Sequence, residues 1–508
     1  MKNLKYIFFS FLLIGFYSCN EVEDVLEDNG VSTPDDLPAL SIEGTGLDFS
    51  NYIAVGPSFT AGQSDGTVFL ASQNNSWPNI MSMEFAKVGG GEFKQPTMDD
   101  NYGGLSLGGT RIVGPRLVFG GSGPVPLESV VGPVTVQTDL LNPPTGPFNN
   151  LGVPGASSFH FVAQGYGNIA NLAAGLANPY ATRLTGSTPN ASIIELAAAQ
   201  NPSFFTLSLF GGNDVLGYAT GGADQATDAI TPLATFEAAL NGALTAMTAN
   251  GAKGVVSGTP HVTDLPYFTA VPYNAVPLDA ATASLLNQGY AAYNGGLQAV
   301  LAALQGTGLF TAEEVAQRTI SFSEGQNAVV IIDENLTDLG AINPAFAAIP
   351  QYRQATENDL LVLTSGSFIG TLADPNNPTS INGVAVPLAD NWVVTETEID
   401  EIITATDAMN DSVEAAANSF GIAYVDLQSI LAEASSTGIM FDDYLLNANL
   451  VTGGLVSLDG IHLTARGYAY MANSFLEAID MQYGSNFVAS GSLAKAGDYP
   501  TNYSPLLQ

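Results

Sequence analysis

The residues of this chain best suited to chemistry include Asp459 and His462, which stand three positions apart near the C-terminus. In a compact turn, a carboxylate can accept a hydrogen bond from one imidazole nitrogen while the other nitrogen faces a nucleophile. That pairing fixes the tautomer of the imidazole and stabilises its charged form when it takes up a proton. The chain has only three histidines, so the pattern favours a general base, although a purely structural histidine stays open.

Two further polar residues follow short apolar runs that are typical of strands. Ser58 comes soon after Tyr52–Val55, and Asn213 comes after Phe204–Phe210 and two glycines. Ligands bind at the carboxyl ends of strands in a parallel α/β sheet, where a serine hydroxyl can attack and an asparagine amide can donate to an oxyanion. Each residue also has a structural explanation, because serine often caps a helix and asparagine often closes a turn.

Together these residues resemble the sequence blocks of the SGNH (GDSL-like) hydrolases. That family has a block around a nucleophilic serine, a second block with a glycine, a GxND block and a DxxH block near the C-terminus. The matching stretches occur here in the same order, from about residue 50 to 480, and are Gly56-Pro57-Ser58-Phe59, Asn150–Ala156, Gly211–Asp214 and Asp459-Gly460-Ile461-His462. In the second block Gly155 corresponds to the glycine of the oxyanion hole, with Gly152 as the alternative.

The resemblance implies a fold and a set of roles. The fold is a flavodoxin-like three-layer α/β/α sandwich with a central parallel sheet (the SGNH hydrolase fold), here with long loop insertions. Ser58 would attack an ester carbonyl and form an acyl-enzyme, with His462 as its base and Asp459 orienting His462. The backbone N–H groups of Ser58 and Gly155 and the amide of Asn213 would form the oxyanion hole. No metal and no organic cofactor is needed.

The first block departs from the family pattern at two positions. Pro57 stands where the family usually has aspartate, and Phe59 replaces leucine. Proline removes a backbone donor and a carboxylate beside the nucleophile, but it is tolerated in a first helical turn. The departure therefore bears on the reaction rate more than on the fold, and Phe59 is interpreted as a core substitution.

The elements that must position these residues alternate between strands and helices. Strands are expected at five apolar runs, which are Tyr52–Val55, Phe204–Phe210, Gly254–Ser257, Ala328–Ile332 and Ala423–Leu427. Near-continuous Val, Ile and Phe runs are typical of parallel strands buried on both faces. Amphipathic helices are expected over 285–304, 398–419 and 465–479, with Thr395 and Glu398 as a capping box and Thr464 as an N-cap. This alternation predicts an α/β fold.

The domain organisation is expected to be a single hydrolase domain over residues 46–483. Residues 86–150, rich in glycine and proline, and residues 336–395 interrupt the alternation and are interpreted as insertions. The first insertion is a candidate for shaping the acyl or alcohol site. Residues 484–508 form a polar tail that is expected to wrap the surface.

The N-terminus predicts export. Lys2 and Lys5 precede an apolar run from residue 6 to 17, which is typical of a signal peptide over residues 1–18. Cys19, the only cysteine, follows at once and resembles the lipidated cysteine of bacterial lipoproteins, although Tyr17 is larger than usual there. An ordinary secretory signal is the alternative. Residues 19–45 are acidic and would form a tether. We therefore expect an outer-membrane lipoprotein of the cell envelope, of the Bacteroidetes type, with exposure at the cell surface left open.

The acidic composition of the chain limits the classes of partner that it can bind. A formal net charge of −36 opposes binding to nucleic acid, and membrane attachment is expected only through the lipid anchor. The expected function is an extracytoplasmic carboxylic ester hydrolase, either a lipase or acylhydrolase or a carbohydrate O-acyl esterase, acting on a small-molecule, lipid or glycan ester. The alternative is a weak or inactive surface lipoprotein of the same fold that binds glycan or another ligand. The oligomeric state stays open.

The other notable side chains have structural interpretations. His160 and His261 are expected at loops or at the rim of a cleft, although Asp264 lies three residues after His261. Asp214 is expected to brace its turn rather than to titrate. The two tryptophans, at 77 and 392, are expected to pack in the core or at a rim, with a sugar-binding cleft as the alternative.

Overall fold

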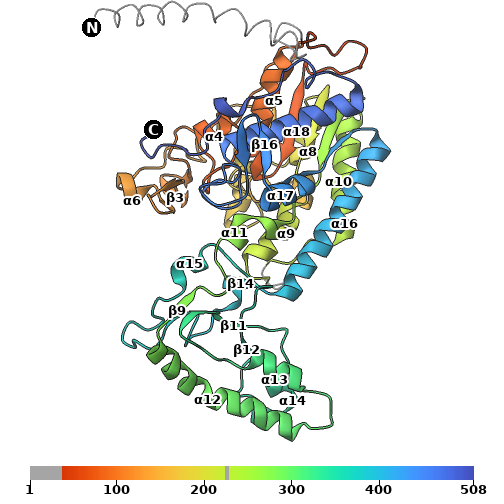
Figure 1. Cartoon of the computed structure of the whole chain (residues 1–508). Helices are drawn as coiled ribbons and strands as arrows, with labels where there is room; N and C mark the ends of the chain where they lie inside the picture. The colour runs from red at the N-terminus through yellow and green to blue at the C-terminus, as the bar shows by residue number, and fades with distance from the viewer. Residues whose placement is uncertain (1–36, 224–227, 508) are drawn as a thin grey trace, which may run out of the picture.

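Five parallel strands form a central sheet in the computed structural model, which describes residues 37–223 and 228–507 (Figure 1). Across the sheet the strands are β15 (Ala423–Val425), β8 (Lys253–Ser257), β7 (Phe204–Leu207), β1 (Tyr52–Gly56) and β6 (Asn150–Gly152). If the five strands are numbered by their order along the chain, their order across the sheet, starting at β6, is 2-1-3-4-5, as in flavodoxin-like sheets. The order reverses direction at β1 and β7, so the turns after these two strands meet where such sheets bind ligands.

Helices flank the sheet on both faces. Helices α5 (Trp77–Ala86) and α18 (Ala465–Tyr483) pack together on one face. The other face is covered by α8 (Ile193–Ala198), α10 (Leu233–Thr248) and α16 (Glu396–Phe420). The predicted α/β class with a central parallel sheet is therefore confirmed, and the arrangement is that of a three-layer sandwich.

Two of the long helices begin at the caps that the sequence predicts. In α16 the Glu398 carboxylate accepts a hydrogen bond of 2.6 Å from the backbone N–H of Thr395, as a capping box requires. In α18 the Thr464 hydroxyl accepts a 3.0 Å bond from the N–H of Gly467. Both caps satisfy backbone donors that have no partner inside the helix.

Four of the five predicted strands are confirmed as members of the parallel sheet. The fifth run, Ala328–Ile332, also contains a strand, β11 (Val330–Ile332), but it does not join the parallel sheet, because it pairs antiparallel with β12 (Tyr352–Gln354) outside that sheet. Its apolar residues are buried in a second core, and a short apolar run does not reveal which core it will join. The edge strand β6 was not predicted as a strand, because a three-residue Asn-Leu-Gly segment carries no apolar periodicity.

A second lobe with its own core lies below the sandwich in Figure 1. Its buried residues run from Val276 to Val393, so this lobe is longer than the expected 336–395 insertion and contains the predicted helix over 285–304. Its elements are β9 (Val276–Leu278), α12 (Ala280–Ala303), α13 (Ala312–Arg318), β10 (Gly325–Asn327), β11, α14 (Leu339–Ile342), η5 (Pro344–Phe346), β12, β13 (Leu360–Leu361), α15 (Ser365–Phe368), η6 (Asp390–Trp392) and β14 (Val393–Val394).

The 86–150 region forms two small hairpins beside the sandwich. It contains β2 (Leu105–Leu107), β3 (Thr110–Val113), β4 (Leu117–Phe119), β5 (Pro124–Pro126) and α6 (Glu128–Val131). The C-terminal tail packs on the body, and within it Phe487 and Ala496 are fully buried. The guanidinium of Arg116 donates to the carbonyl of Ser504, which ties the tail to this region.

The remaining elements are short. They are α3 (Ser58–Ala61), α4 (Leu70–Asn74), α7 (Ser158–Val162), η2 (Ile169–Ala174), η3 (Ala181–Arg183), α9 (Gly212–Thr220), η4 (Val262–Asp264), α11 (Pro266–Thr269), α17 (Leu427–Ser436), β16 (Ile439–Phe441), β17 (Tyr444–Leu446) and η7 (Ala496–Asp498). None of the helices within 37–223 and 228–507 is long and apolar enough to cross a bilayer. The predicted signal peptide and Cys19, with most of the predicted tether, lie outside the described residues.

Candidate active site

Ser58, His462 and Asp459 lie together at the carboxyl end of β1. Ser58 is the first residue of α3, directly after the strand, and its hydroxyl oxygen lies 2.8 Å from Nε2 of His462. The other ring nitrogen, Nδ1, lies 2.7 Å from Oδ2 of Asp459. Ser58 and His462 are each only 6% exposed. Residues separated by about four hundred positions in the chain thus form one hydrogen-bonded relay.

A tight turn holds Asp459 and His462 in this arrangement. The N–H of Ser457 donates to the carbonyl of His462 over 2.7 Å, which closes the turn just before α18. Gly460 has a left-handed backbone with φ +75°, and a Cβ at this position would lie 2.8 Å from the backbone nitrogen of Tyr267. Only glycine combines that conformation with so close an approach, so Gly460 is needed for His462 to face Ser58.

The Asp459 carboxylate is saturated with hydrogen-bond donors. Oδ1 accepts from the backbone N–H groups of Ile461 and His462, each at 2.9 Å, and from the hydroxyl of Ser457 at 3.0 Å. Oδ2 accepts from the N–H of Gly66 at 2.8 Å in addition to the imidazole. Burial alone would raise the pKa of Asp459, but His462 and these donors hold it well below its ordinary value. The carboxylate is therefore charged across the physiological pH range.

The turn before the nucleophile is packed too tightly for any side chain at position 56. A Cβ on Gly56 would lie 2.3 Å from the hydroxyl of Thr60 and 2.7 Å from the carbonyl of Ser208. Pro57 is the N-cap of α3, and its carbonyl accepts from the backbone N–H groups of Thr60 and Ala61. Proline needs no N–H at this place, so Pro57 is compatible with the hydrogen bond between Ser58 and His462.

The second and third sequence blocks interlock beside Ser58. The side-chain amide of Asn213 donates to the carbonyl of Ala156 over 3.1 Å, and the hydroxyl of Ser157 lies 3.3 Å from the carbonyl of Asn213. An asparagine amide carries two N–H donors, so the bond to Ala156 orients the group and leaves a second donor. Asn213 and Ser58 line the same pocket.

The two glycines that compete for the oxyanion role differ in their surroundings. A Cβ on Gly152 would lie 2.2 Å from the backbone nitrogen of Ala61, so this glycine is explained by the packing of β6 against α3. Gly155 has φ +76° and space around it, and it precedes Ala156, the residue that Asn213 contacts. Gly155 is not among the described residues that line the pocket with Ser58.

The turn between β7 and α9 is strained next to the site. Leu209 has φ +48°, a left-handed conformation that costs a non-glycine residue about 1–3 kcal/mol and that clusters at functional sites. Asp214, in the first turn of α9, accepts from both the backbone N–H and the hydroxyl of Ser158 at 2.8 and 2.6 Å. It therefore braces the turn, as expected, and burial raises its pKa.

A narrow apolar pocket of about 80 Å³ opens beside Ser58. Leucine, isoleucine, valine and methionine side chains from several elements dominate its wall, among them Leu209, Leu216, Val262, Leu265, Leu427, Ile430, Leu431, Leu455, Ile461, Leu463 and Met471. Phe59 belongs to this wall as well, and its ring centroid lies 5.2 Å from that of His462, so it is more than a core substitution. No described residue of the 86–150 region lines the pocket.

The other side chains singled out in the sequence are not part of the relay, although His261 stands between Pro260 and Val262, which line the pocket. His160 accepts a hydrogen bond from the N–H of Ser157 and stacks on Tyr166, and His261 pairs with Asp407 at 2.7 Å. Both tryptophans pack against phenylalanine rings, one in each core.

Two contributors to the site were not predicted. Ser457 stands two residues before Asp459, a spacing that suits a side-chain hydrogen bond and could have suggested its role. Gly66 is about four hundred positions away in the chain and contributes only a backbone N–H, for which the sequence has no signal.

Comparisons of the chain with models of known families, with curated proteins and with solved structures find no match. The interpretation of the site therefore depends on its own geometry.

Proposed function

We propose that this chain is a serine ester hydrolase of the SGNH type, with Ser58 as nucleophile, His462 as base and Asp459 as the orienting carboxylate. The observation that carries the proposal is the relay in which Ser58 Oγ lies 2.8 Å from Nε2 and Asp459 lies 2.7 Å from Nδ1 of one imidazole. A nucleophile, a base and a charged orienting group in this order are the requirements of acyl transfer through a covalent intermediate.

The reaction uses these groups in two balanced steps. Ser58 Oγ attacks the ester carbonyl carbon while its proton passes to Nε2 of His462, and the imidazolium is stabilised by Asp459. The tetrahedral intermediate then expels the alkoxide, which takes the proton from His462 and leaves as an alcohol. Water attacks the resulting acyl-Ser58 with His462 as base again, which releases the carboxylic acid and restores the hydroxyl.

The oxyanion of the tetrahedral intermediate requires donors on the side of Ser58 opposite the base. We assign this role to the backbone N–H groups of Ser58 and Gly155 and to the second N–H of Asn213. The support is that Asn213 lines the pocket with Ser58 and is anchored to Ala156, next to Gly155. One such donor is typically worth about 10²–10³ in rate. No step requires a metal or an organic cofactor.

The pocket favours an acyl group of hydrocarbon character over a sugar as the part that enters beside Ser58. Its wall has few polar groups with which to pair hydroxyls, and burying an unpaired hydroxyl is costly. A lipase or acylhydrolase is therefore favoured over an esterase whose pocket would hold a carbohydrate. The alcohol part of the substrate lies outside this pocket, so a glycan ester of a long-chain acid is also compatible.

We also propose that the protein works in the cell envelope as an outer-membrane lipoprotein anchored through Cys19. The support is the sequence of residues 1–19 alone. Metabolic labelling with a palmitate analogue tests this: the label is expected on the wild type and absent from Cys19→Ala. Labelling that persists in Cys19→Ala contradicts the anchor.

A fluorophosphonate probe tests the nucleophile. We expect the wild type to be labelled and Ser58→Ala to be unlabelled, because no other serine has a hydroxyl in such a relay among the described residues. Ser50→Ala is the matched control, since Ser50 is exposed just before β1, and this variant should label like the wild type. A wild type that stays unlabelled and hydrolyses no nitrophenyl ester contradicts the enzyme and favours the alternative, a surface lipoprotein that binds its ligand without turning it over.

The acyl preference has its own test. Ile430 is half-buried on α17 and lines the pocket, so Ile430→Trp should fill it. We expect kcat/KM for long-chain nitrophenyl esters to fall about 100-fold, while the acetate ester changes little, because a lost hydrocarbon subsite is worth about 1–3 kcal/mol. Ala432→Trp, exposed on the same helix, is the control. Equal losses on acetate and long-chain esters would place the acyl chain elsewhere.

A further inference from the structure

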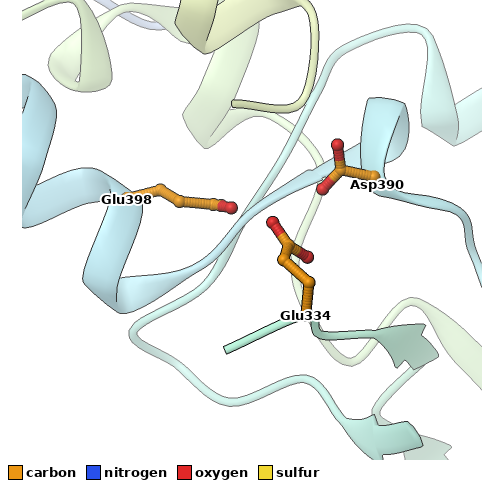
Figure 2. Close-up of side chains that lie close together, drawn as sticks. All are labelled: Glu334, Asp390 and Glu398. Carbon is orange, nitrogen blue, oxygen red and sulfur yellow. The ribbon is translucent and has the colours of Figure 1, made fainter. Parts of the chain in front are cut away.

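Three carboxylates converge where the second lobe joins the sandwich (Figure 2). Glu334 lies just after β11, Asp390 begins η6, and Glu398 is in the first turn of α16. One carboxylate oxygen from each lies within 4.8 Å of the others. Figure 2 shows the three side chains projecting toward a common centre from three separate segments.

Glu398 leaves one oxygen of a buried carboxylate without a partner. The residue is only 3% exposed, and its Oε2 accepts the capping bond from the N–H of Thr395. Its Oε1 is buried and has no hydrogen-bond partner, and the side chain points toward Glu334 and Asp390. A buried carboxylate oxygen without a partner is costly, so either a proton shared with the neighbouring Glu334 carboxyl or a bound cation must satisfy it.

Neither helix capping nor ion pairing accounts for the approach of Glu334 to Glu398. Capping of α16 involves Oε2 of Glu398, but it involves neither its Oε1 nor the Glu334 side chain that approaches from another segment. The two arginines nearest to Glu334 along the chain are already engaged: Arg318 pairs with Glu314 at 3.2 Å, and Arg353 pairs with Asp333 at 2.5 Å and with Asp359 at 2.6 Å. Within the described residues, neither Glu334 nor Glu398 forms an ion pair with a lysine or arginine.

We propose that Glu334, Asp390 and Glu398 bind a calcium ion. A donor set made only of carboxylate oxygens selects hard cations over zinc or copper, which prefer nitrogen and sulfur. Calcium–oxygen distances of about 2.3–2.6 Å place opposite ligands about 4.6–5.2 Å apart, which suits oxygens within 4.8 Å of one another. Calcium tolerates the irregular geometry of ligands drawn from three segments, whereas magnesium demands a near-ideal octahedron at about 2.1 Å and tends to keep several of its waters. Water completes the shell on the exposed side, where Glu334 lies.

The ion would fasten the second lobe to the sandwich. Glu334 and Asp390 belong to segments of the lobe, whereas Glu398 belongs to α16, which packs on the central sheet. Calcium at this junction would therefore restrain the lobe relative to the body. The site is separate from the relay around Ser58 and does not depend on the proposed hydrolase activity.

Calorimetric titration of the full-length protein, stripped with EDTA and held at moderate ionic strength, tests the proposal with CaCl₂ as the probe. We expect one calcium ion to bind per chain and to raise the melting temperature. Glu334→Gln should weaken calcium binding at least about tenfold, because it removes one charged ligand from an exposed position that the fold does not need. Asp390→Asn should do the same, and MgCl₂ should bind more weakly than CaCl₂.

Glu396→Gln is the matched control, because it makes the same charge change two residues from Glu398 on the same helix. Glu396 is exposed, accepts a hydrogen bond from Asn358 and is not part of the cluster. Its calcium affinity should stay within about twofold of the wild type. A wild type that binds no calcium overturns the proposal, as does a loss in Glu396→Gln equal to that in Glu334→Gln, or magnesium binding as tight as calcium binding.

Discussion

Asp459 and Glu398 are both nearly buried carboxylates that accept backbone hydrogen bonds, yet their surroundings are opposite. Every side-chain oxygen of Asp459 has donors, including an imidazole, and its pKa is held well below the ordinary value. Glu398 has donors on one oxygen only. Burial and the adjacent Glu334 carboxyl raise the pKa of Glu398 to about 8. One carboxylate is stabilised as an anion by the protein alone, and the other is not.

The difference separates two uses of a buried acid. A carboxylate that must stay charged while a neighbouring histidine gains and loses a proton needs its donors built into the fold, since they have to act at every turnover. A carboxylate without donors is stable as an anion only when a cation comes from outside. We therefore interpret the relay around Asp459 as catalytic and the carboxylate cluster around Glu398 as a ligand site. Separate experiments can contradict each interpretation.

The largest expected effect is that of removing the charge of Asp459. Asp459→Asn should lower kcat on a nitrophenyl ester about 10⁴-fold, because an amide stabilises the wrong imidazole tautomer and no longer balances the imidazolium. Steady-state kinetics at neutral pH, with circular dichroism to verify folding, measure this change. Glu396→Gln, which also removes one acidic charge, should keep wild-type kcat. A loss below tenfold in a folded Asp459→Asn would mean that Asp459 is structural, like a helix cap.

A third buried acid, Asp65, also has a hydrogen-bond partner on only one of its carboxylate oxygens. Asp65 is 2% exposed, accepts from the N–H of Leu458 through Oδ1, and has no partner on Oδ2. Burial, with the neighbouring Asp459 charge, raises its pKa to about 7. The folded chain then holds a proton that the unfolded chain loses above about pH 4. The free energy of unfolding therefore falls as pH rises from about 4 to about 7, and stays low above that.

Asp65→Asn should remove this loss, because an amide keeps the acceptor oxygen but cannot ionise. Relative to the wild type, the variant should gain about 4 kcal/mol of stability at pH 8 and little at pH 4. Thermal unfolding of both proteins at the two pH values measures the gain. Asp411→Asn, at an exposed position of α16, should show no such difference. A gain of equal size at both pH values would mean that packing, not ionisation, is responsible.

Two of the blocks around the relay, Gly56–Phe59 and Gly211–Asp214, could be predicted because each combines an apolar strand with a turn whose residue types are chemically specific. The spacing of Asp459 and His462 sufficed to place a carboxylate on the imidazole. The cluster of Glu334, Asp390 and Glu398 could not be predicted in the same way. Its members come from three segments with no shared spacing, and acidic residues are common throughout a chain of charge −36.

The fold shows the same limit. Near-continuous apolar runs predicted four strands of the parallel sheet, because burial on both faces imposes that composition. The run Ala328–Ile332 satisfies the same rule, yet it packs in the core of the second lobe. The local sequence pattern indicates that a segment is buried. Which of the two cores the segment joins depends on contacts between residues far apart in the sequence, such as the pairing of β11 with β12.

The smallest expected effect isolates one of the bonds that distinguish Asp459 from Glu398. Ser457 is 2% exposed, donates to Oδ1 of Asp459 and accepts from the N–H of Asp65, both at 3.0 Å. Ser457→Ala should lower kcat about tenfold with KM unchanged, since one hydrogen bond to a charged group is worth about 1.5–3 kcal/mol and the backbone donors to Asp459 remain. Ser457→Thr keeps the hydroxyl and should restore most of kcat. A lower melting temperature with unchanged kcat in Ser457→Ala would show that the bond supports the turn without positioning the carboxylate, and the catalytic distinction would then rest on the backbone donors and the imidazole.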